Sequence, residues 1–97
     1  MIVERRTYKV KHGQWRNLVE LIKAEMAAIG PEIGSRIYNP IVGPFGVIVH
    51  DLEFKDMAER EKFWAKWMEK RATPEFWAKY HEMVTPHGHS EIWDVVD

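Results

Sequence analysis

Four residues, three near the start of the chain and one near its middle, have the side-chain types needed to bind an anion and to move a proton. Glu4, Arg6 and Tyr8 alternate along the segment IVERRTYKV at 2–10, so in an extended strand their side chains share one side. A guanidinium can hold an oxyanion, and an imidazole can act as a base near neutral pH. His50 lies in a second strand-like segment that we expect beside the first. These four residues predict a ligand site, with His50 as the candidate catalytic base.

The same residues also have a structural interpretation. A buried network of Glu4, Arg6 and Tyr8 would fix the register between two subunits, because buried polar groups need partners whether or not they bind a ligand. Neutralised networks of this kind are common in small interfaces. Arg5 points to the opposite side of the strand from Arg6, and the sequence leaves open which of the two arginines faces a site.

Two histidines near the end of the chain, His87 and His89, suggest metal binding. Two imidazoles in a turn fall short of a metal site, and His50, His81 or Glu91 would have to converge on them as a third ligand. The spacing matches no standard metal motif. We therefore expect no metal and no cofactor, and we interpret Pro86-His87-Gly88 as a loop.

Six aromatic side chains at helical spacing could form the wall of a pocket for haem or a polyaromatic compound. They are Phe63, Trp64, Trp67, Phe76, Trp77 and Tyr80. Aromatic residues at this spacing more often form plain core. We therefore expect them to fill the helix side of the sheet, which would leave room for a ligand only on the other face.

Arg60 lies one helical turn before Trp64. We expect it to form a structural ion pair with Asp51 or Glu53, or to pack its guanidinium on the indole, rather than to take part in catalysis.

The order of the hydrophobic patterns predicts the fold that positions these residues. Strands are expected at 2–10, 33–39, 47–54 and 90–96; one helix is expected over 15–29, and a helical stretch is expected to begin after Asp56 and restart at Thr73-Pro74. Gly30 is expected to end the first helix in a left-handed conformation. The order β-α-β-β-α-β is that of the ferredoxin-like α+β fold, an antiparallel sheet with helices on one face.

Length and composition restrict the class of protein. The chain has 97 residues, a formal charge of -1 and no cysteine, which predicts a single domain over residues 1–97 without disulfides or thiolate sites. Acidic and basic residues are interspersed, so we expect no nucleic-acid partner. No apolar run is long enough to span a bilayer, and no basic-then-apolar leader precedes the first strand. We expect a cytoplasmic protein.

Two of the predicted strands carry apolar residues on both sides. Residues 47–49 are Val-Ile-Val, and the last strand places Ile92, Trp93, Val95 and Val96 on both of its sides. A half-solvated antiparallel strand would alternate apolar and polar residues. Because one chain has helices for one face only, we expect a second copy to cover the other face in a homodimer.

Several short motifs resemble the NIPSNAP-like branch of the dimeric α/β-barrel proteins. The opening VERRTYKVKHG at 3–13 is similar to that family's E-L-R-x-Y strand and glycine turn, although Arg5 replaces an aliphatic residue. LEFKDMAERE at 52–61 and TPEFW at 73–77 are similar to its second-helix start and its D-P-x-W restart, with Thr73 for Asp. The resemblance implies a homodimer whose two sheets form a barrel with a central cleft, and it implies no particular activity.

Two functions fit these observations, and the sequence leaves both open. The first is a small dimeric barrel protein that binds a phenolic or anionic organic molecule in the cleft between the sheets, through Glu4, Arg6, Tyr8 and His50. The alternative is a cofactor-independent monooxygenase or isomerase acting on a small aromatic substrate, since the wider superfamily that the chain resembles includes such enzymes. A solvent-reachable cavity with Arg6, Tyr8 or His50 at its wall is required for the enzyme.

Overall fold

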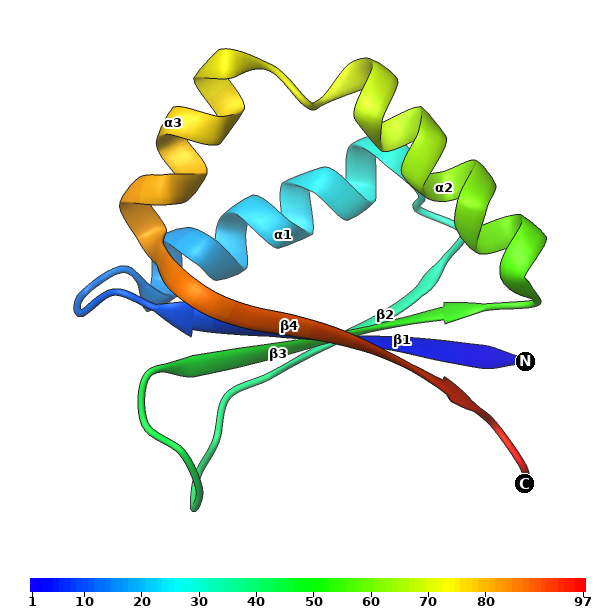
Figure 1. Cartoon of the computed structure of the whole chain (residues 1–97), viewed down its shortest axis with the longest axis horizontal. Helices are drawn as coiled ribbons and strands as arrows, with labels where there is room; N and C mark the ends of the chain where they lie inside the picture. The colour runs from blue at the N-terminus through cyan, green and yellow to red at the C-terminus, as the bar shows by residue number, and fades with distance from the viewer.

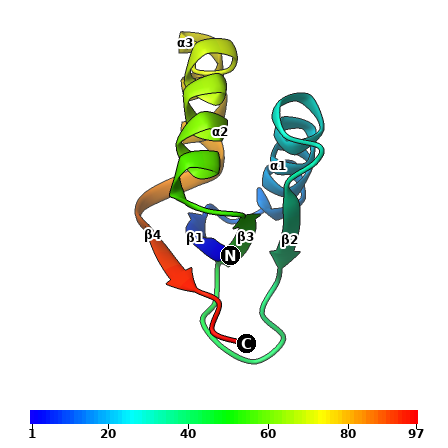
Figure 2. The same cartoon turned by 90° about the vertical axis from the view of Figure 1, so that its right-hand side faces the viewer.

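The computed structural model describes all 97 residues and has a four-stranded antiparallel sheet with three helices on one face (Figures 1 and 2). The elements in chain order are β1 (Ile2–Val10), α1 (Trp15–Ile29), β2 (Gly34–Tyr38), β3 (Val47–Phe54), α2 (Met57–Lys70), α3 (Pro74–Met83) and β4 (Val84–Asp94). The strand order in the sheet is β2-β3-β1-β4. The predicted ferredoxin-like α+β fold is confirmed, and β1, which carries Glu4, Arg6 and Tyr8, is a central strand beside β3, which carries His50.

Side-chain caps divide the second helical stretch into α2 and α3. The Asp56 carboxylate accepts a hydrogen bond from the Glu59 backbone N–H at 2.9 Å, while the Glu59 carboxylate accepts one from the Lys55 N–H at 2.7 Å. Thr73 Oγ1 accepts from the Phe76 N–H at 3.1 Å, and Pro74 occupies the first position of α3. These caps satisfy backbone donors that a helix start leaves free. The predicted starts of both helices are confirmed.

Gly30 ends α1, but not in the expected left-handed conformation. Its φ is −148°, and its N–H donates to the Met26 carbonyl at 3.0 Å. A Cβ atom at this position would lie 2.6 Å from Phe63 Cε1. Glycine is therefore needed here because α1 packs closely against α2. The backbone conformation itself would allow another residue.

The main core lies between the sheet and the helices. Its buried residues include Leu18, Ile22 and Ile29 of α1, Ile48, Leu52 and Phe54 of β3, and Phe63 and Trp67 of α2. Each set comes from one stripe of a helix or one face of a strand, as burial against a single partner layer requires. None of the helices combines the length and the apolar character needed to cross a membrane.

The last strand differs from its predicted form at both ends. It begins at Val84, six residues before the predicted start, and ends at Asp94 rather than Val96. The segment Pro86-His87-Gly88 is not a separate loop, because pairing with β1 resumes on both sides of it, at Lys9–Thr85 and Thr7–His89. The interruption is a bulge, which lets the strand continue past a proline that cannot donate to the ladder.

The face of the sheet opposite the helices carries both apolar and charged groups. Strand register places Val3, Val49 and Trp93 on this open face together with the ion pair of Arg5 and Asp51. The 39–46 connection and the C-terminal end lie on the same side (Figure 2). In the connection, Ile41, Val42 and Phe45 are 98%, 95% and 99% exposed. Of the two apolar runs in the sequence, the chain leaves the last one exposed at Ile92, Trp93, Val95 and Val96, whereas Val47 and Ile48 are buried within the chain.

Candidate functional site

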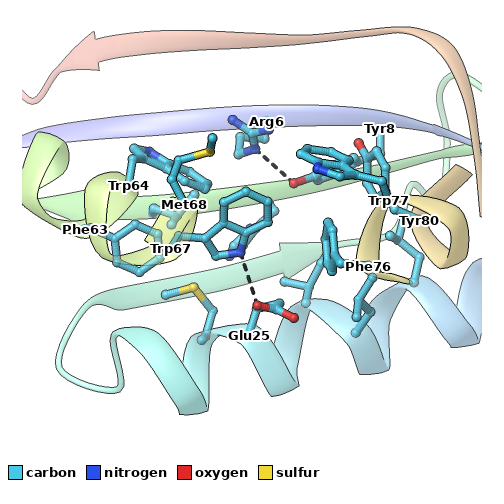
Figure 3. A pocket seen from close by; sticks show the side chains of 16 residues that line it. Arg6, Tyr8, Glu25, Phe63, Trp64, Trp67, Met68, Phe76, Trp77 and Tyr80 are labelled. Carbon is cyan, nitrogen blue, oxygen red and sulfur yellow. Dashed lines mark hydrogen bonds between the residues drawn. The ribbon is translucent and has the colours of Figure 1, made fainter. Parts of the chain in front are cut away.

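A cavity of about 340 Å³ lies between the sheet and the helices, and its wall is mostly aromatic and aliphatic (Figure 3). It is lined by Arg6 and Tyr8 of β1, Leu18, Leu21, Ile22, Glu25 and Met26 of α1, His50 and Leu52 of β3, Phe63, Trp64, Trp67 and Met68 of α2, and Phe76, Trp77 and Tyr80 of α3. The aromatic residues that were expected to fill the helix side as plain core instead surround a space of ligand size.

The candidate site residues face the helices, which corrects the expectation that they face away from them. Register pairs Arg6 with His50 across β1 and β3, and both line the cavity together with Tyr8. Glu4 lies on the same side and bonds to α2. The prediction failed because the tryptophan-rich helices were assumed to pack tightly on the sheet, whereas α1 and the α2–α3 pair leave a cavity over it. The four residues are brought together, but not in a cleft between sheets.

Glu4 is fully buried and accepts four hydrogen bonds. The donors are Arg60 Nε at 2.7 Å, Trp64 Nε1 at 2.8 Å, Arg6 Nη1 at 3.0 Å and Ser90 Oγ at 3.1 Å. Burial alone would raise the pKa of Glu4, but the bonds from Trp64, Arg60 and Arg6 outweigh it and hold the pKa below its ordinary value. Glu4 is therefore a charged, fully engaged carboxylate.

This network leaves one positive charge in excess. Two guanidiniums, Arg6 and Arg60, share the single carboxylate of Glu4, and a guanidinium carries one positive charge. Only Arg6 of the pair lines the cavity. The excess charge therefore faces the cavity through Arg6.

Arg6 also keeps hydrogen-bonding capacity for a ligand. Its Nε donates to the Tyr8 hydroxyl at 2.9 Å and its Nη1 to Glu4, while its Nη2 has no hydrogen-bond partner in the chain. No buried side-chain nitrogen or oxygen lacks a partner, so this Nη2 group is accessible. The guanidinium lies 4.8 Å from the Trp64 ring centre, and this packing holds it in place at the wall.

The surroundings of His50 make it a weaker base than the acid/base residue expected near neutral pH. Burial, followed by the positive charge of Arg6, lowers the pKa of His50 to about 4. Its Nε2 lies 2.7 Å from Ser35 Oγ. The imidazole is therefore neutral at pH 7, hydrogen-bonded to a hydroxyl, and a weak proton acceptor.

Tyr8 and Tyr80 meet at one end of the cavity, with ring centres 6.2 Å apart in an edge-to-face arrangement. Burial raises the pKa of Tyr80 to about 12, so its phenol is protonated at neutral pH. The Tyr8 oxygen accepts a hydrogen bond from Arg6. The end of the cavity thus offers phenol groups beside a guanidinium.

Sequence reasoning missed a second charged cluster at the opposite wall. Glu25 of α1 accepts two hydrogen bonds from Arg71, at 2.8 and 2.7 Å, and one from Trp67 Nε1 at 3.1 Å. These contacts tie the end of α2 to α1 and orient the Trp67 indole in the cavity (Figure 3). An acid beside Met26 on the apolar stripe of α1 was the signal available in the sequence.

The contacts of Arg60 and Arg5 answer two questions that the sequence left open. Arg60 forms its ion pair with Glu4, not with Asp51 or Glu53, because it lies over the helix face of the sheet. Arg5 points to the open face, where it donates two hydrogen bonds of 2.8 Å to Asp51. Of the two neighbouring arginines, Arg6 is the one at the cavity.

His87 and His89, at the β4 bulge, have no third ligand gathered beside them. No group of three or more histidine or acidic side chains in the chain is arranged to hold an ion. His89 Nε2 lies 3.7 Å from Glu91 Oε1, and both side chains are exposed.

Comparison with known proteins agrees with the fold and the motifs. The NIPSNAP family model matches residues 3–93. A crystal structure of a protein from Agrobacterium tumefaciens is 24% identical, with a TM-score of 0.76 over 97% of this chain and 92% of that one. A NIPSNAP family protein of the same organism is 19% identical, with a TM-score of 0.79 over 99% and 86%.

The fold extends to a structure described as an antibiotic biosynthesis monooxygenase. It is 14% identical and has a TM-score of 0.67 over all of both chains, a likeness of fold alone. No curated protein matches this chain.

Proposed function

The chain belongs to the NIPSNAP family, and we propose that it binds a small aromatic anion, a carboxylate or a phenolate, in the cavity between its helices and its sheet. The observation that carries this proposal is the Arg6 guanidinium, which brings an uncompensated positive charge and a free Nη2 donor to the wall of an aromatic cavity.

The size and lining of the cavity support a ring-shaped ligand. A volume of about 340 Å³ lies at the lower end of small-molecule sites, where a few polar groups fix the orientation of a mostly apolar ligand. Trp64, Trp67 and Trp77 offer aromatic faces and edges along the wall. A one- or two-ring aromatic body would occupy this part, and its anionic group would lie against Arg6 beside Tyr8.

The proposal includes a homodimer formed through the open face of the sheet. Ile41, Val42 and Phe45 are almost completely exposed in the chain, and Trp93 is 55% exposed. Exposed apolar side chains on one side of the molecule support an interaction surface there. A second copy would cover this face without closing the cavity, which lies on the helix side.

An oxygenase or isomerase without a cofactor is the alternative activity at the same cavity. Such chemistry needs a proton acceptor near the substrate, and the low pKa of His50 makes that residue a poor one. The surroundings of His50 therefore favour binding over proton transfer. Oxygen uptake with a phenolic substrate would favour the enzyme instead.

The proposal is tested by titrating benzoate, 1-naphthoate and 4-hydroxybenzoate into the protein by calorimetry. Arg6→Gln removes the charge and keeps a polar amide on the same side of the strand. A hydrogen bond to a charged group contributes about 1.5–3 kcal/mol, so we expect the affinity for these acids to fall about 10-fold or more.

Arg5→Gln is the matched control, because it removes the same charge from the next residue of the same strand, on the opposite face. Its affinity for the acids should stay within about twofold of wild type. Equal losses in the two variants, or no binding of any acid by the wild-type protein, would contradict the proposal.

A further inference from the structure

One ring nitrogen of the buried His50 has no hydrogen-bond partner in the chain. The residue is 3% exposed, and its Nε2 lies 2.7 Å from Ser35 Oγ, while its Nδ1 makes no hydrogen bond. Every fully buried side-chain nitrogen or oxygen has a partner, so Nδ1 must be reached from an open space. His50 lines the aromatic cavity described above. Nδ1 therefore borders this cavity, and the proposed function leaves it unused.

His50 and Arg6 are neighbours on the face of the sheet that forms the cavity. Strand register pairs the two residues across β1 and β3, and side chains directly opposite each other on antiparallel strands have Cβ atoms about 4.5–5.5 Å apart. Both side chains line the cavity, and the positive charge of Arg6 acts on the imidazole. One small ligand can therefore meet the free Nη2 of Arg6 and the free Nδ1 of His50 together.

The His50 imidazole offers hydrogen-bonding capacity without a charge. Burial and the charge of Arg6 lower the pKa of His50 to about 4, so at pH 7 one ring nitrogen donates and the other accepts. The Ser35 hydroxyl can donate to Nε2 or accept from it, which leaves Nδ1 as a donor in the first case and an acceptor in the second. A ligand hydroxyl suits both cases, because a hydroxyl donates and accepts.

Other ligand groups suit this position less well than a hydroxyl. An apolar ring edge would exclude water from Nδ1 and leave a polar atom unpaired, which weakens binding. A second carboxylate would bring a second negative charge, whereas Arg6 and Arg60 together leave only one positive charge uncompensated by Glu4. Sites that hydrogen-bond a ligand hydroxyl discriminate strongly against the analogue that lacks it.

We propose that His50 is a specificity-determining residue of the cavity, and that the preferred ligand is an aromatic acid that also carries a hydroxyl. The carboxylate of this ligand lies on Arg6, its hydroxyl pairs with Nδ1 of His50, and its ring lies among the tryptophans. This inference rests on the proposed function and deepens it by giving the class of ligand.

Benzoate and the three isomeric hydroxybenzoates test this class of ligand. All four compounds are carboxylates at pH 7, and the hydroxybenzoates differ from benzoate by one uncharged hydroxyl. By calorimetry we expect the best of the three isomers to bind at least about fivefold more tightly than benzoate, because its hydroxyl pairs a nitrogen that benzoate leaves without a partner. If no isomer binds more tightly than benzoate, the inference is overturned.

His50→Phe keeps a flat ring at this position and removes both nitrogens. Ser35 is exposed, so its hydroxyl can turn to water and no buried polar group loses a partner. We expect the preference for the hydroxybenzoate over benzoate to fall to within about twofold of none. The matched control His12→Phe makes the same replacement at an exposed position that does not line the cavity, and it should keep the preference. Equal preferences in the two variants would contradict the assignment to His50.

A measurement on the wild-type protein serves if His50→Phe does not fold, as judged by near-ultraviolet circular dichroism of its tryptophans. Nitrogen-15 NMR of the histidine rings follows the hydrogen bonds of each ring nitrogen. The His50 signals are those of the histidine that stays neutral as the pH is lowered through the ordinary titration range. The best hydroxybenzoate should shift the Nδ1 signal clearly more than benzoate does. Equal shifts with the two ligands would overturn the inference.

The outcomes separate this inference from the function on which it rests. If benzoate and 1-naphthoate bind in an Arg6-dependent way but a hydroxyl adds nothing to the affinity, the proposed function stands and the role of His50 is wrong. If no aromatic acid binds the wild-type protein, both proposals are overturned.

Discussion

At the scale of single residues, the site depends on which of two neighbouring arginines faces the helices. Arg6 shares the Glu4 carboxylate with Arg60 inside the molecule, whereas Arg5 pairs with Asp51 on the open face. Alternation along the strand predicted that the two point to opposite sides. The burial of Glu4 against Arg60 and Trp64 decides which side of the strand faces the helices. These contacts are distant in the chain, because Arg60 lies 56 positions and Trp64 lies 60 positions after Glu4.

Glu4→Gln should destabilise the protein by about 3 kcal/mol, because it leaves two guanidiniums beside a buried group that carries no charge. Chemical denaturation at pH 7 measures the loss. The native pKa of Glu4 lies below its unfolded value of 4.5, so its contribution is present above that pH and is lost as the pH falls through the native pKa. The difference between wild type and variant should therefore shrink in acid. If the difference in the free energy of unfolding between wild type and variant did not change with pH, the stabilisation would not come from the charge of the Glu4 carboxylate.

His50 gives a separate dependence of stability on pH. Its native pKa of about 4 lies below the unfolded value of 6.5, so between these values the unfolded chain binds a proton that the folded chain does not. Stability should fall as the pH is lowered through this window, by on the order of 3 kcal/mol from this residue. His50→Gln should remove this part of the slope. His12→Gln, at an exposed position, should leave it unchanged.

At the scale of elements, the boundaries of β1, α1 and β3 follow from hydrophobic period and end signals, and the structure confirms them at 2–10, 15–29 and 47–54. The start of β4 was missed because Pro86 and Gly88 are turn residues by local rules. Pairing with β1 on both sides of them overrides that preference. The cavity was missed for a related reason, since a helical stripe shows which side chains face inward and does not show how closely the helices approach the sheet.

Gly30 tests the approach of α1 to α2. Gly30→Ala adds a Cβ atom that would lie 2.6 Å from Phe63 Cε1, and overpacking of this kind costs about 1–3 kcal/mol. Because the φ of Gly30 is negative, the cost should come from the contact and not from backbone strain. Thermal unfolding of Gly30→Ala, Phe63→Leu and the double variant checks this. The two changes should be clearly non-additive, with a smaller penalty for Gly30→Ala when Phe63→Leu is already present; additive losses would argue against the clash.

At the scale of the whole molecule, the helices cover one face of the sheet and the other face remains open (Figure 2). The sequence indicated this imbalance through apolar residues on both sides of β3 and in the last strand. It did not show that the most exposed apolar side chains lie in the connection between β2 and β3.

We expect light scattering at low micromolar concentration to give twice the mass of the 11.5 kDa chain. Phe45→Asp should shift the protein toward monomer, because a charge would be buried in the interface, and it should leave the monomer fold intact since Phe45 is 99% exposed. Met57→Asp, at a partly exposed position on the helix side, is the control. A monomeric wild-type protein would contradict the proposed dimer.

The fixed charges around the aromatic cavity have a consequence for selectivity. Arg6 stays charged, Glu4 is pinned in its ionised form by four donors, and His50 stays neutral. None of the three changes its protonation state over the neutral range, so the pH profile of binding to this cavity should trace the acidity of the ligand and not that of the protein. Carboxylic acids would bind almost uniformly across that range, whereas phenols would bind more tightly as they ionise. For a series of ring-substituted phenols titrated at several pH values, the pH at which the affinity is half-way to its maximum should therefore follow the pKa of each phenol.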